Sequence, residues 1–284
     1  MHLDHDASTN PEKDSFPMRI KPSPLVAVAA IVGYLVVVFG VWVAVGMEYD
    51  DIGDTIESVQ KGVVLAIGLG AVYLVAVTSV LGWWKPAIHE PRRVGRGWMW
   101  VVPGLLVVGF GLNLVATEWG EIDDVGAFAF WLAVGTLFVG FSEELLTRGL
   151  AIVGGRGAMH EKWVWAFSGA IFGLIHVPNA LFGQSIGSTL QQVVFAFAVG
   201  LTYYVTRRIS GTLIVTMVLH ALWDFSLFIQ AHSVDRLEEK TASFGSFAMY
   251  LAVIIGIVAL VKILKTGDVV EPGGDQVAAF ERQA

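Results

Sequence analysis

Long apolar stretches separated by short polar segments run through most of this chain. Each stretch is close to the roughly 20 residues that a helix needs to cross about 30 Å of hydrocarbon. A helix also satisfies its own backbone hydrogen bonds in lipid. We therefore expect an all-α, polytopic membrane protein with about eight membrane-spanning helices. The predicted spans are residues 25–45, 62–81, 98–116, 125–146, 163–182, 189–205, 209–229 and 244–264.

The two flanks of this apolar region are polar. Residues 1–24 carry several acidic side chains and lack the apolar core of a secretory signal peptide, which predicts a flexible N-terminal tail. Beyond residue 265 the sequence Glu271-Pro272-Gly273-Gly274 breaks a helix, which predicts a polar C-terminal tail at 266–284. Residues 25–265 are predicted to form a single transmembrane domain, with its candidate chemistry at about 125–230.

Basic and acidic segments alternate between successive predicted helices. Cytoplasmic loops are enriched in Lys and Arg, so the basic segments are expected in the cytoplasm, together with both termini. The basic positions include Arg19, Arg92, Arg93, Arg96, Arg156, Arg207, Arg208 and Lys262. We expect Arg207 and Arg208 in the loop before the seventh helix, as determinants of topology. The intervening segments 48–57 and 118–124 are acidic.

Composition agrees with lipid as the solvent. Of 284 residues, 55% are hydrophobic and only 15% are charged, which is more apolar surface than one soluble domain could enclose. The protein is therefore expected in the cell membrane, as a multi-pass protein among membrane lipids. The chain has no cysteine, which excludes disulfides, thiolate metal sites and a cysteine nucleophile. A net charge of -7 without a basic stripe argues against nucleic acid as a partner.

Few ionisable side chains lie inside the predicted helices. Inserting one such side chain into the membrane costs roughly 2.5 to 3.5 kcal/mol, so each is expected to have a functional role and a polar or charged partner. They form three groups: Glu143, Glu144 and Arg148 end the fourth helix, His176 lies in the fifth, four residues after Phe172, and His220 and Asp224 lie in the seventh. Elsewhere the membrane interior offers neutral polar side chains such as Asn113, Gln191 and Gln192.

The spacing of these groups predicts how they pair. Glu144 and Arg148 are four residues apart and share a helix face, so we expect an ion pair whose guanidinium extends toward the cytoplasmic headgroups. Glu143 is turned about 100° around the helix from Glu144. We therefore expect the Glu144 carboxylate to be held by Arg148 and the Glu143 carboxylate to be free for chemistry. His220 and Asp224 also lie four residues apart and project to one side. We expect the three groups to converge between the fourth, fifth and seventh helices.

Two kinds of hydrolytic chemistry fit these residue types. His176, His220, Glu143 and Asp224 could hold a metal such as Zn, with a position left for water. Without a metal, a carboxylate in an apolar setting, assisted by a histidine, could deprotonate water directly. Both routes stay open from the sequence. A serine mechanism is less favoured, because no separate base is specified for Ser142.

At these residues the chain resembles the CPBP family of intramembrane proteases, which includes the CAAX prenyl endopeptidases and Abi-like relatives linked to bacteriocin processing and immunity. The three family motifs EExxxR, FxxxH and HxxxN or HxxxD occur in order between about residues 141 and 225. The resemblance implies an eight-helix fold, hydrolysis of a peptide bond in a membrane-embedded or lipid-modified substrate, and a cavity open to membrane and cytoplasm.

The resemblance also implies roles for the motif residues. Glu143 and His176 would activate water, and His220 and Asp224 would stabilise the oxyanion or contact a metal. The chain has Asp224 where the eukaryotic prenyl proteases have Asn, and an ionised Asp cannot donate a hydrogen bond to an oxyanion. Asp224 would then be protonated, orient His220 or bind metal. Arg148 could equally be a structural counter-ion or a residue that contacts the substrate. Phe172 and Trp223 are expected to be packing residues with no part in the chemistry.

Two other functions use the same residues. A proton-coupled transporter could relay protons through them, although no matching set occurs in an inverted repeat. A non-catalytic membrane protein of the same fold, acting in immunity or regulation, is the third hypothesis. The sequence does not indicate the substrate.

Overall fold

A computed structural model describes residues 18–234 and 244–281, so most of the predicted N-terminal tail lies outside the described residues. Within these ranges the chain is all-α, and eight helices are long and apolar enough to cross a membrane. The predicted fold class and multi-pass membrane location are confirmed. Several spans combine two or three shorter elements.

The helices are α1 (Pro24–Val45), α2 (Ile56–Ser58), α3 (Ala66–Leu81), α4 (Trp84–Ile88), α5 (Val101–Val115), α6 (Val125–Glu144), α7 (Ala151–Arg156), α8 (Glu161–Leu174), α9 (Ile186–Ser210), α10 (Leu213–Val234), α11 (Phe244–Leu264) and α12 (Ala278–Glu281). Two π-helical segments, Val59–Leu65 and Leu145–Leu150, join α2 to α3 and α6 to α7. Short 3-10 turns lie at Gly97–Trp100, Trp119–Glu121 and Val177–Phe182.

Local sequence signals set the ends of α1. The Ser23 hydroxyl accepts a hydrogen bond from the Val26 amide at 3.2 Å, and Pro24 takes the first helical position, where its missing N–H costs nothing. Gly46 ends the helix at φ 66°, a conformation that glycine adopts without strain.

The boundary between the sixth and seventh spans differs from the prediction. The sequence predicts a loop at 206–208, but α9 continues to Ser210 and the chain turns at Gly211, with φ 81°. Arg207 and Arg208 therefore lie in the last turns of α9, where both are fully buried. The loop prediction is wrong because the two arginines have acidic partners inside the protein and need no exposure to water.

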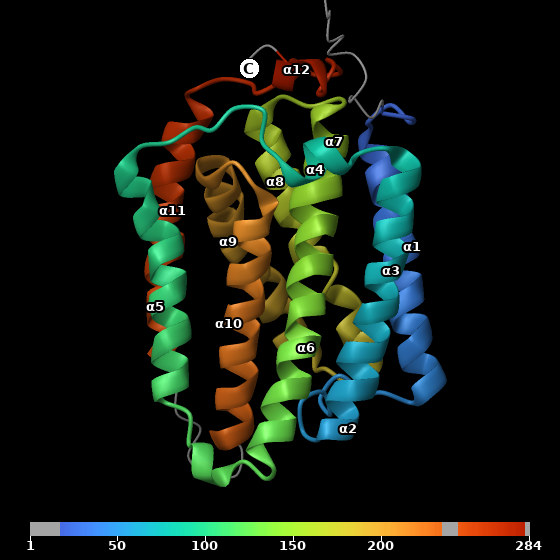
Figure 1. Cartoon of the computed structure of the whole chain (residues 1–284), viewed down its shortest axis with the longest axis vertical. Helices are drawn as coiled ribbons and strands as arrows, with labels where there is room; N and C mark the ends of the chain where they lie inside the picture. Colours follow the sequence, from blue (N-terminus) through green and yellow to red (C-terminus); the bar gives the residue numbers. More distant parts are fainter. Residues whose placement is uncertain (1–17, 235–243, 282–284) are drawn as a thin grey trace, which may run out of the picture.

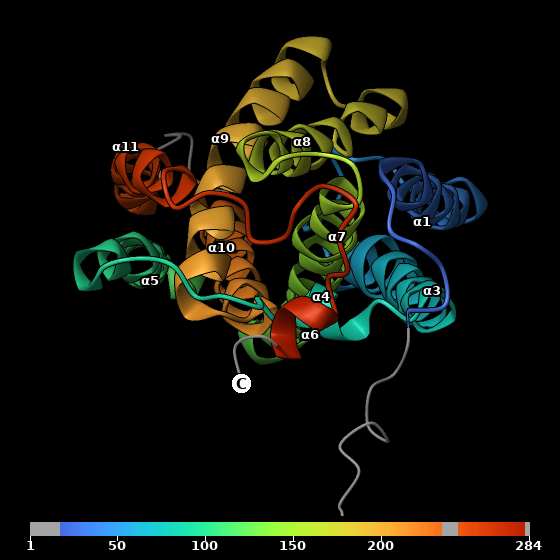
Figure 2. The same cartoon turned by 90° about the horizontal axis from the view of Figure 1, so that it is seen from above.

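The spans form one bundle with α6 and α10 side by side at its centre (Figures 1 and 2). Helices α5 and α11 lie on one flank and α1 and α3 on the other, while α8 and α9 cover a third face. We call the end where α1 begins and α12 lies the basic end, and the opposite end, with loops 46–55 and 116–124, the acidic end. The side of the membrane that each end faces stays a prediction.

The C-terminal segment lies across the basic end (Figure 1). The Gln276 side chain donates a hydrogen bond to the Val153 carbonyl at 2.8 Å, and the Gly273 amide donates one to the Arg156 carbonyl at 3.1 Å. The Asp268 carboxylate accepts from the Glu161 amide at 2.6 Å, at the start of α8. Residues 266–281 are thus docked on the membrane domain.

The close contact of α6 with α10 depends on Gly140. A Cβ at this position would lie 2.5 Å from the Met217 carbonyl oxygen and 2.8 Å from the Ala221 nitrogen. We expect Gly140→Ala to cost about 1–3 kcal/mol, because the two backbones must separate. The measurement is the midpoint of thermal unfolding in detergent, with Gly126→Ala on the same helix as control, since its Cβ meets nothing within 4 Å. Equal midpoints for the two variants would contradict this account.

Candidate active site

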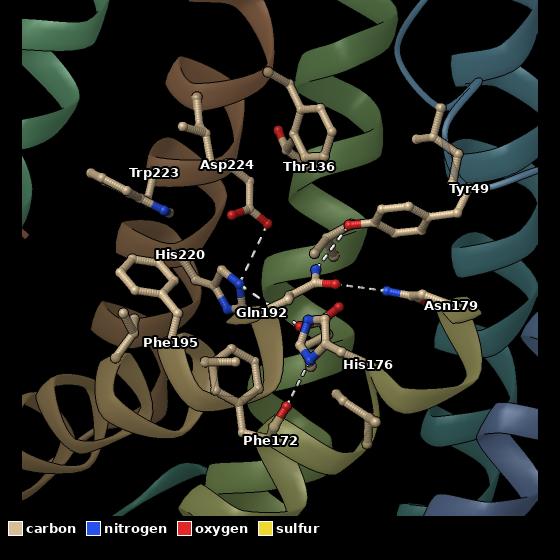
Figure 3. Close-up of a pocket in the computed structure, with 18 of the residues that line it drawn as sticks. Tyr49, Thr136, Phe172, His176, Asn179, Gln192, Phe195, His220, Trp223 and Asp224 are labelled. Carbon is tan, nitrogen blue, oxygen red and sulfur yellow. Dashed lines mark hydrogen bonds and ion pairs between the residues drawn. The ribbon is translucent and has the colours of Figure 1, made fainter. Parts of the chain in front are cut away.

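A cavity of about 1020 Å³ lies among α1, α3, α6, α8, α9, α10 and α11. Most of its lining is apolar or aromatic, and four ionisable side chains of the three sequence motifs face it: Glu143, His176, His220 and Asp224. Figure 3 shows His176, just past the end of α8, and His220 of α10 facing the same space. The motif residues therefore converge between the fourth, fifth and seventh spans.

Glu144 and Arg148 form the predicted ion pair where α6 passes into the π-helical segment. The Arg148 Nη1 donates to Glu144 Oε1 at 2.8 Å, and both side chains are fully buried. The guanidinium lies over the Phe172 ring, 4.0 Å from its centroid, and near the Tyr203 ring. The expectation that Arg148 extends to the headgroups is wrong, because Glu144 and the two rings enclose it.

Glu143 faces the cavity while its neighbour Glu144 faces Arg148. The Glu143 side chain is 16% exposed, and its Oε2 lies 3.9 Å from His220 Nε2. No basic side chain of Lys or Arg is paired with it among the described residues. The two adjacent carboxylates thus have different surroundings, as their 100° separation predicts.

His176 follows the last turn of α8, and its ring is held by its own helix. The Nδ1–H donates to the Phe172 carbonyl at 2.8 Å, and the two rings meet edge to face (Figure 3). Since a carbonyl oxygen can only accept, Nδ1 carries the proton and Nε2 of the neutral ring is left as an acceptor. The four-residue spacing of Phe172 and His176 makes this bond possible.

His220 connects the anchored carboxylate to Asp224. Its Nδ1 lies 3.1 Å from Glu144 Oε1, and its Nε2 lies 3.4 Å from Asp224 Oδ2. The Tyr203 ring stacks on the imidazole at 5.0 Å between centroids. These contacts hold the His220 ring on three sides at the edge of the cavity.

Two groups of cavity residues escaped the sequence analysis. Tyr203 is one, and a neutral hydrogen-bonded network around Gln192 is the other (Figure 3). Gln192 Nε2 donates to the Tyr49 hydroxyl at 2.8 Å, and its Oε1 accepts from Asn179 at 3.1 Å. The sequence marks Gln192 as polar within the membrane, but no spacing rule joins it to Tyr49 from another span. Burial raises the pKa of Tyr49, so this hydroxyl stays protonated and neutral.

The described residues do not meet the geometry of a metal site. No group of three or more His, Asp or Glu side chains within them is arranged to hold an ion. The four candidate Zn ligands are Glu143, His176, His220 and Asp224. Two of them face each other rather than a common ion, because His220 Nε2 points at the Asp224 carboxylate. We therefore derive no chemical step through a metal.

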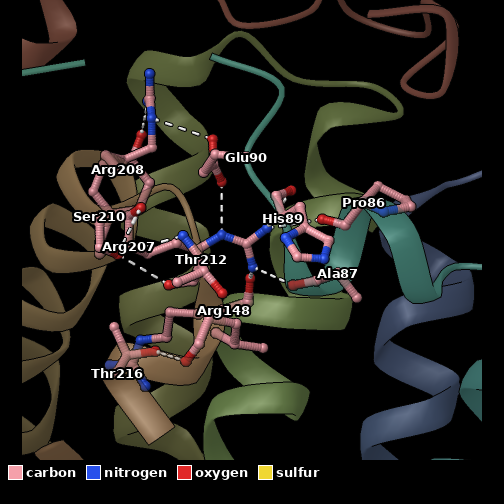
Figure 4. Close-up of polar contacts among 12 residues, drawn as sticks. Pro86, Ala87, His89, Glu90, Arg148, Arg207, Arg208, Ser210, Thr212 and Thr216 are labelled. Atoms are coloured by element: carbon pink, nitrogen blue, oxygen red, sulfur yellow. Dashed lines mark hydrogen bonds and ion pairs between the residues drawn. The ribbon is translucent and has the colours of Figure 1, made fainter. Parts of the chain in front are cut away.

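A buried ion-pair cluster lies between the site and the basic end (Figure 4). Glu90 accepts from Arg207 Nε at 2.6 Å and from Arg156 Nη2 at 2.9 Å. Glu161 accepts from Arg156 at 2.8 Å and from Arg208 at 2.9 Å. Burial by itself would raise the pKa of Glu90, but the charges of Arg156, Arg207 and Arg208 outweigh it and hold the pKa below its usual value. Arg207 also donates to the Arg148 carbonyl, which joins this cluster to the segment that carries the site.

Comparison with known proteins points to one family. Residues 125–226 match the family model described as type II CAAX prenyl endopeptidase Rce1-like. No curated protein and no solved structure gives a significant match. The matched segment contains all three motifs, from Glu143 to Asp224. The predicted resemblance to the CAAX-type intramembrane proteases is confirmed over residues 125–226, where the chain carries an Rce1-like domain.

Proposed function

We propose that this protein hydrolyses a peptide bond of a membrane-embedded or lipid-modified substrate, with water activated by Glu143 and His176. The observation that carries the proposal is the contrast between the two adjacent glutamates. Glu144 is buried against Arg148, whereas Glu143 faces an apolar cavity together with an imidazole. A carboxylate in such a setting is suited to accept a proton from water.

Water activation divides between two acceptors. The oxygen of the water molecule attacks the carbonyl carbon of the substrate. As it does so, the Glu143 carboxylate takes one proton from that water. His176 Nε2 accepts a hydrogen bond from the same water, because its Nδ1 is committed to the Phe172 carbonyl. When the tetrahedral intermediate collapses, the proton held by Glu143 passes to the leaving amine. Protons and charge balance without a further reactant.

His220 stabilises the oxyanion in this proposal. Both of its ring nitrogens lie beside carboxylate oxygens. In this proposal the His220 ring is protonated, so that each nitrogen carries an N–H group that can donate a hydrogen bond. Its Nε2–H is the group near the cavity that can turn toward a developing negative charge. Asp224 acts as a positioning residue that orients the His220 ring.

The experiment is cleavage of a panel of membrane-anchored peptides, prenylated and unmodified, by purified protein in detergent. We expect His176→Ala to lower the cleavage rate by about 10²–10⁴-fold, the usual range for loss of an acid–base group. His160→Ala is the matched control, because the His160 side chain is half exposed and does not line the cavity. We expect it to cleave like the parent.

Two outcomes would change the proposal. Loss of parent activity on adding a chelator would favour the metal hypothesis over direct activation by Glu143. No cleavage of any peptide by well-folded parent protein would favour the transporter or the non-catalytic hypothesis.

A further inference from the structure

The hydrogen bonds around Gln192 run in one direction. Gln192 Oε1 accepts from Asn179 Nδ2 and from Gln184 Nε2, each at 3.1 Å. Since an amide nitrogen can only donate, these two contacts identify the oxygen of the Gln192 side chain, and its other end is the NH₂ group. That group donates to the Tyr49 hydroxyl oxygen at 2.8 Å. Tyr49 is therefore the acceptor at the end of this network.

This arrangement leaves the hydroxyl proton of Tyr49 free to donate. A phenol oxygen that accepts one hydrogen bond still carries its own O–H group. Among the described residues this O–H group has no acceptor. Burial raises the pKa of Tyr49, and the negative charges of Glu143 and Asp224 raise it further, so the proton stays on the oxygen at neutral pH. The cavity thus contains a neutral donor that a bound molecule can use.

Contacts with three other parts of the chain hold Tyr49 in place. Its amide N–H donates to the Phe182 carbonyl at 2.6 Å, which ties loop 46–55 to the 3-10 turn that follows α8. Its ring lies beside the Trp42 ring of α1, with 6.3 Å between the centroids. Gln192 of α9 holds the hydroxyl oxygen. The donor is therefore positioned before a substrate binds, which is what stabilisation of a developing charge requires.

The Tyr49 hydroxyl belongs to the space where the peptide bond would be cleaved. Tyr49 lines the same cavity as Glu143, His176, His220 and Asp224 (Figure 3). The charges of both carboxylates act on its hydroxyl, so the hydroxyl lies near both of them. A carbonyl group attacked by water that Glu143 holds must lie in this same space.

We propose that the Tyr49 hydroxyl is a second hydrogen-bond donor to the carbonyl oxygen of the cleaved peptide bond, beside His220. This inference rests on the proposed function and adds a catalytic residue to it. As water attacks, the carbonyl oxygen becomes negatively charged and the hydrogen bond from Tyr49 strengthens, while the proton stays on Tyr49. Gln192 is a positioning residue that acts through the Tyr49 oxygen. The family match begins at residue 125 and assigns no role to Tyr49.

The test is Tyr49→Phe, which keeps the ring and removes only the hydroxyl. With a peptide that the parent cleaves, we expect kcat to fall by about 10²–10³-fold with KM unchanged, as for the loss of one oxyanion donor. The acid limb of the pH–rate profile should keep its position, because Glu143 remains the base. Tyr73→Phe is the matched control, since Tyr73 of α3 does not line the cavity, and we expect it to cleave like the parent.

A double-mutant cycle tests the role of Gln192. Gln192→Leu removes the hydrogen bond to Tyr49 and should lower kcat in the parent background. In the Tyr49→Phe background the same change should have no further effect, because Gln192 acts through the hydroxyl that is already absent. Thermal midpoints recorded for each variant separate this effect from a loss of stability. Effects of the two changes that multiply independently would overturn the positioning role.

The outcomes separate this inference from the proposed function. Parent kinetics in Tyr49→Phe protein, with His176→Ala inactive, would overturn the inference and leave the proposed function standing. A rise in KM alone would make Tyr49 a residue that only binds the substrate, and a shifted acid limb would show that it acts on the proton affinity of Glu143. Either result would overturn the assignment to the oxyanion. If well-folded parent protein cleaves no peptide, the proposed function fails and this inference fails with it.

Discussion

Glu143→Gln is expected to lower peptide cleavage by about 10²–10⁴-fold while the protein keeps its stability. Glutamine has nearly the same shape but cannot take a proton from water. Glu143 pairs with no Lys or Arg in the described structure and lies 3.9 Å from His220, so loss of its charge leaves no buried guanidinium unpaired. The measurement is the initial rate of cleavage, with the thermal midpoint of the same preparation recorded beside it.

Glu144→Gln is the matched control, with the same change one residue away. Its carboxylate pairs with Arg148 at 2.8 Å in a fully buried setting, so the substitution leaves an uncompensated charge inside the protein. We expect a loss of about 3–5 kcal/mol in stability. A Glu143→Gln protein that cleaves at the parent rate would exclude Glu143 as the base. An equal fall in both midpoints would show that the two glutamates share a structural role.

Glu90→Gln is expected to cause the largest loss of stability outside the site. Glu90 is fully enclosed and accepts from Arg156 and Arg207, with Arg208 also near it. Without the carboxylate these guanidinium groups repel one another in a buried setting, and breaking such a network costs about 3–5 kcal/mol. The measurement is the thermal midpoint in detergent near neutral pH. Glu57→Gln is the control, because Glu57 forms an exposed pair with Lys61, and its midpoint should equal that of the parent.

The pH dependence of stability tests the same cluster. Its arginines hold the pKa of Glu90 below the ordinary value of 4.5, so the unfolded chain binds a proton at higher pH than the folded protein does. The stability that Glu90 contributes is full above the ordinary pKa and falls as the pH drops through the lowered folded value. The parent midpoint should therefore fall more steeply than that of Glu90→Gln below about pH 4.5. Parallel curves would contradict the role assigned to Glu90.

Pairs within one helix could be predicted from the chain alone. The four-residue spacing of Glu144 with Arg148, and of His220 with Asp224, places each pair on one face whatever the rest of the fold does. Both pairs form at the predicted positions. The same local geometry predicts that Glu143 and Glu144 face different surroundings.

The surroundings of the charged groups could not be predicted in this way. Arg148 looks like a residue that extends to the headgroups, but Phe172 and Tyr203 from two other helices enclose it. Arg207 and Arg208 look like loop residues, but Glu90 and Glu161 pair with them inside the protein. Each partner lies far away in the sequence, so no period or spacing indicates it.

The sequence by itself determined the number of spans, the three motifs and the pairs within each helix. Those features depend on the thickness of the bilayer and the pitch of a helix, which act on neighbouring residues. Only the tertiary structure decided that Tyr203 stacks on His220, that Tyr49 meets Gln192, and that Phe172 and Tyr203 enclose Arg148. These depend on how side chains from separate helices pack at close range, which the pattern along one helix does not specify.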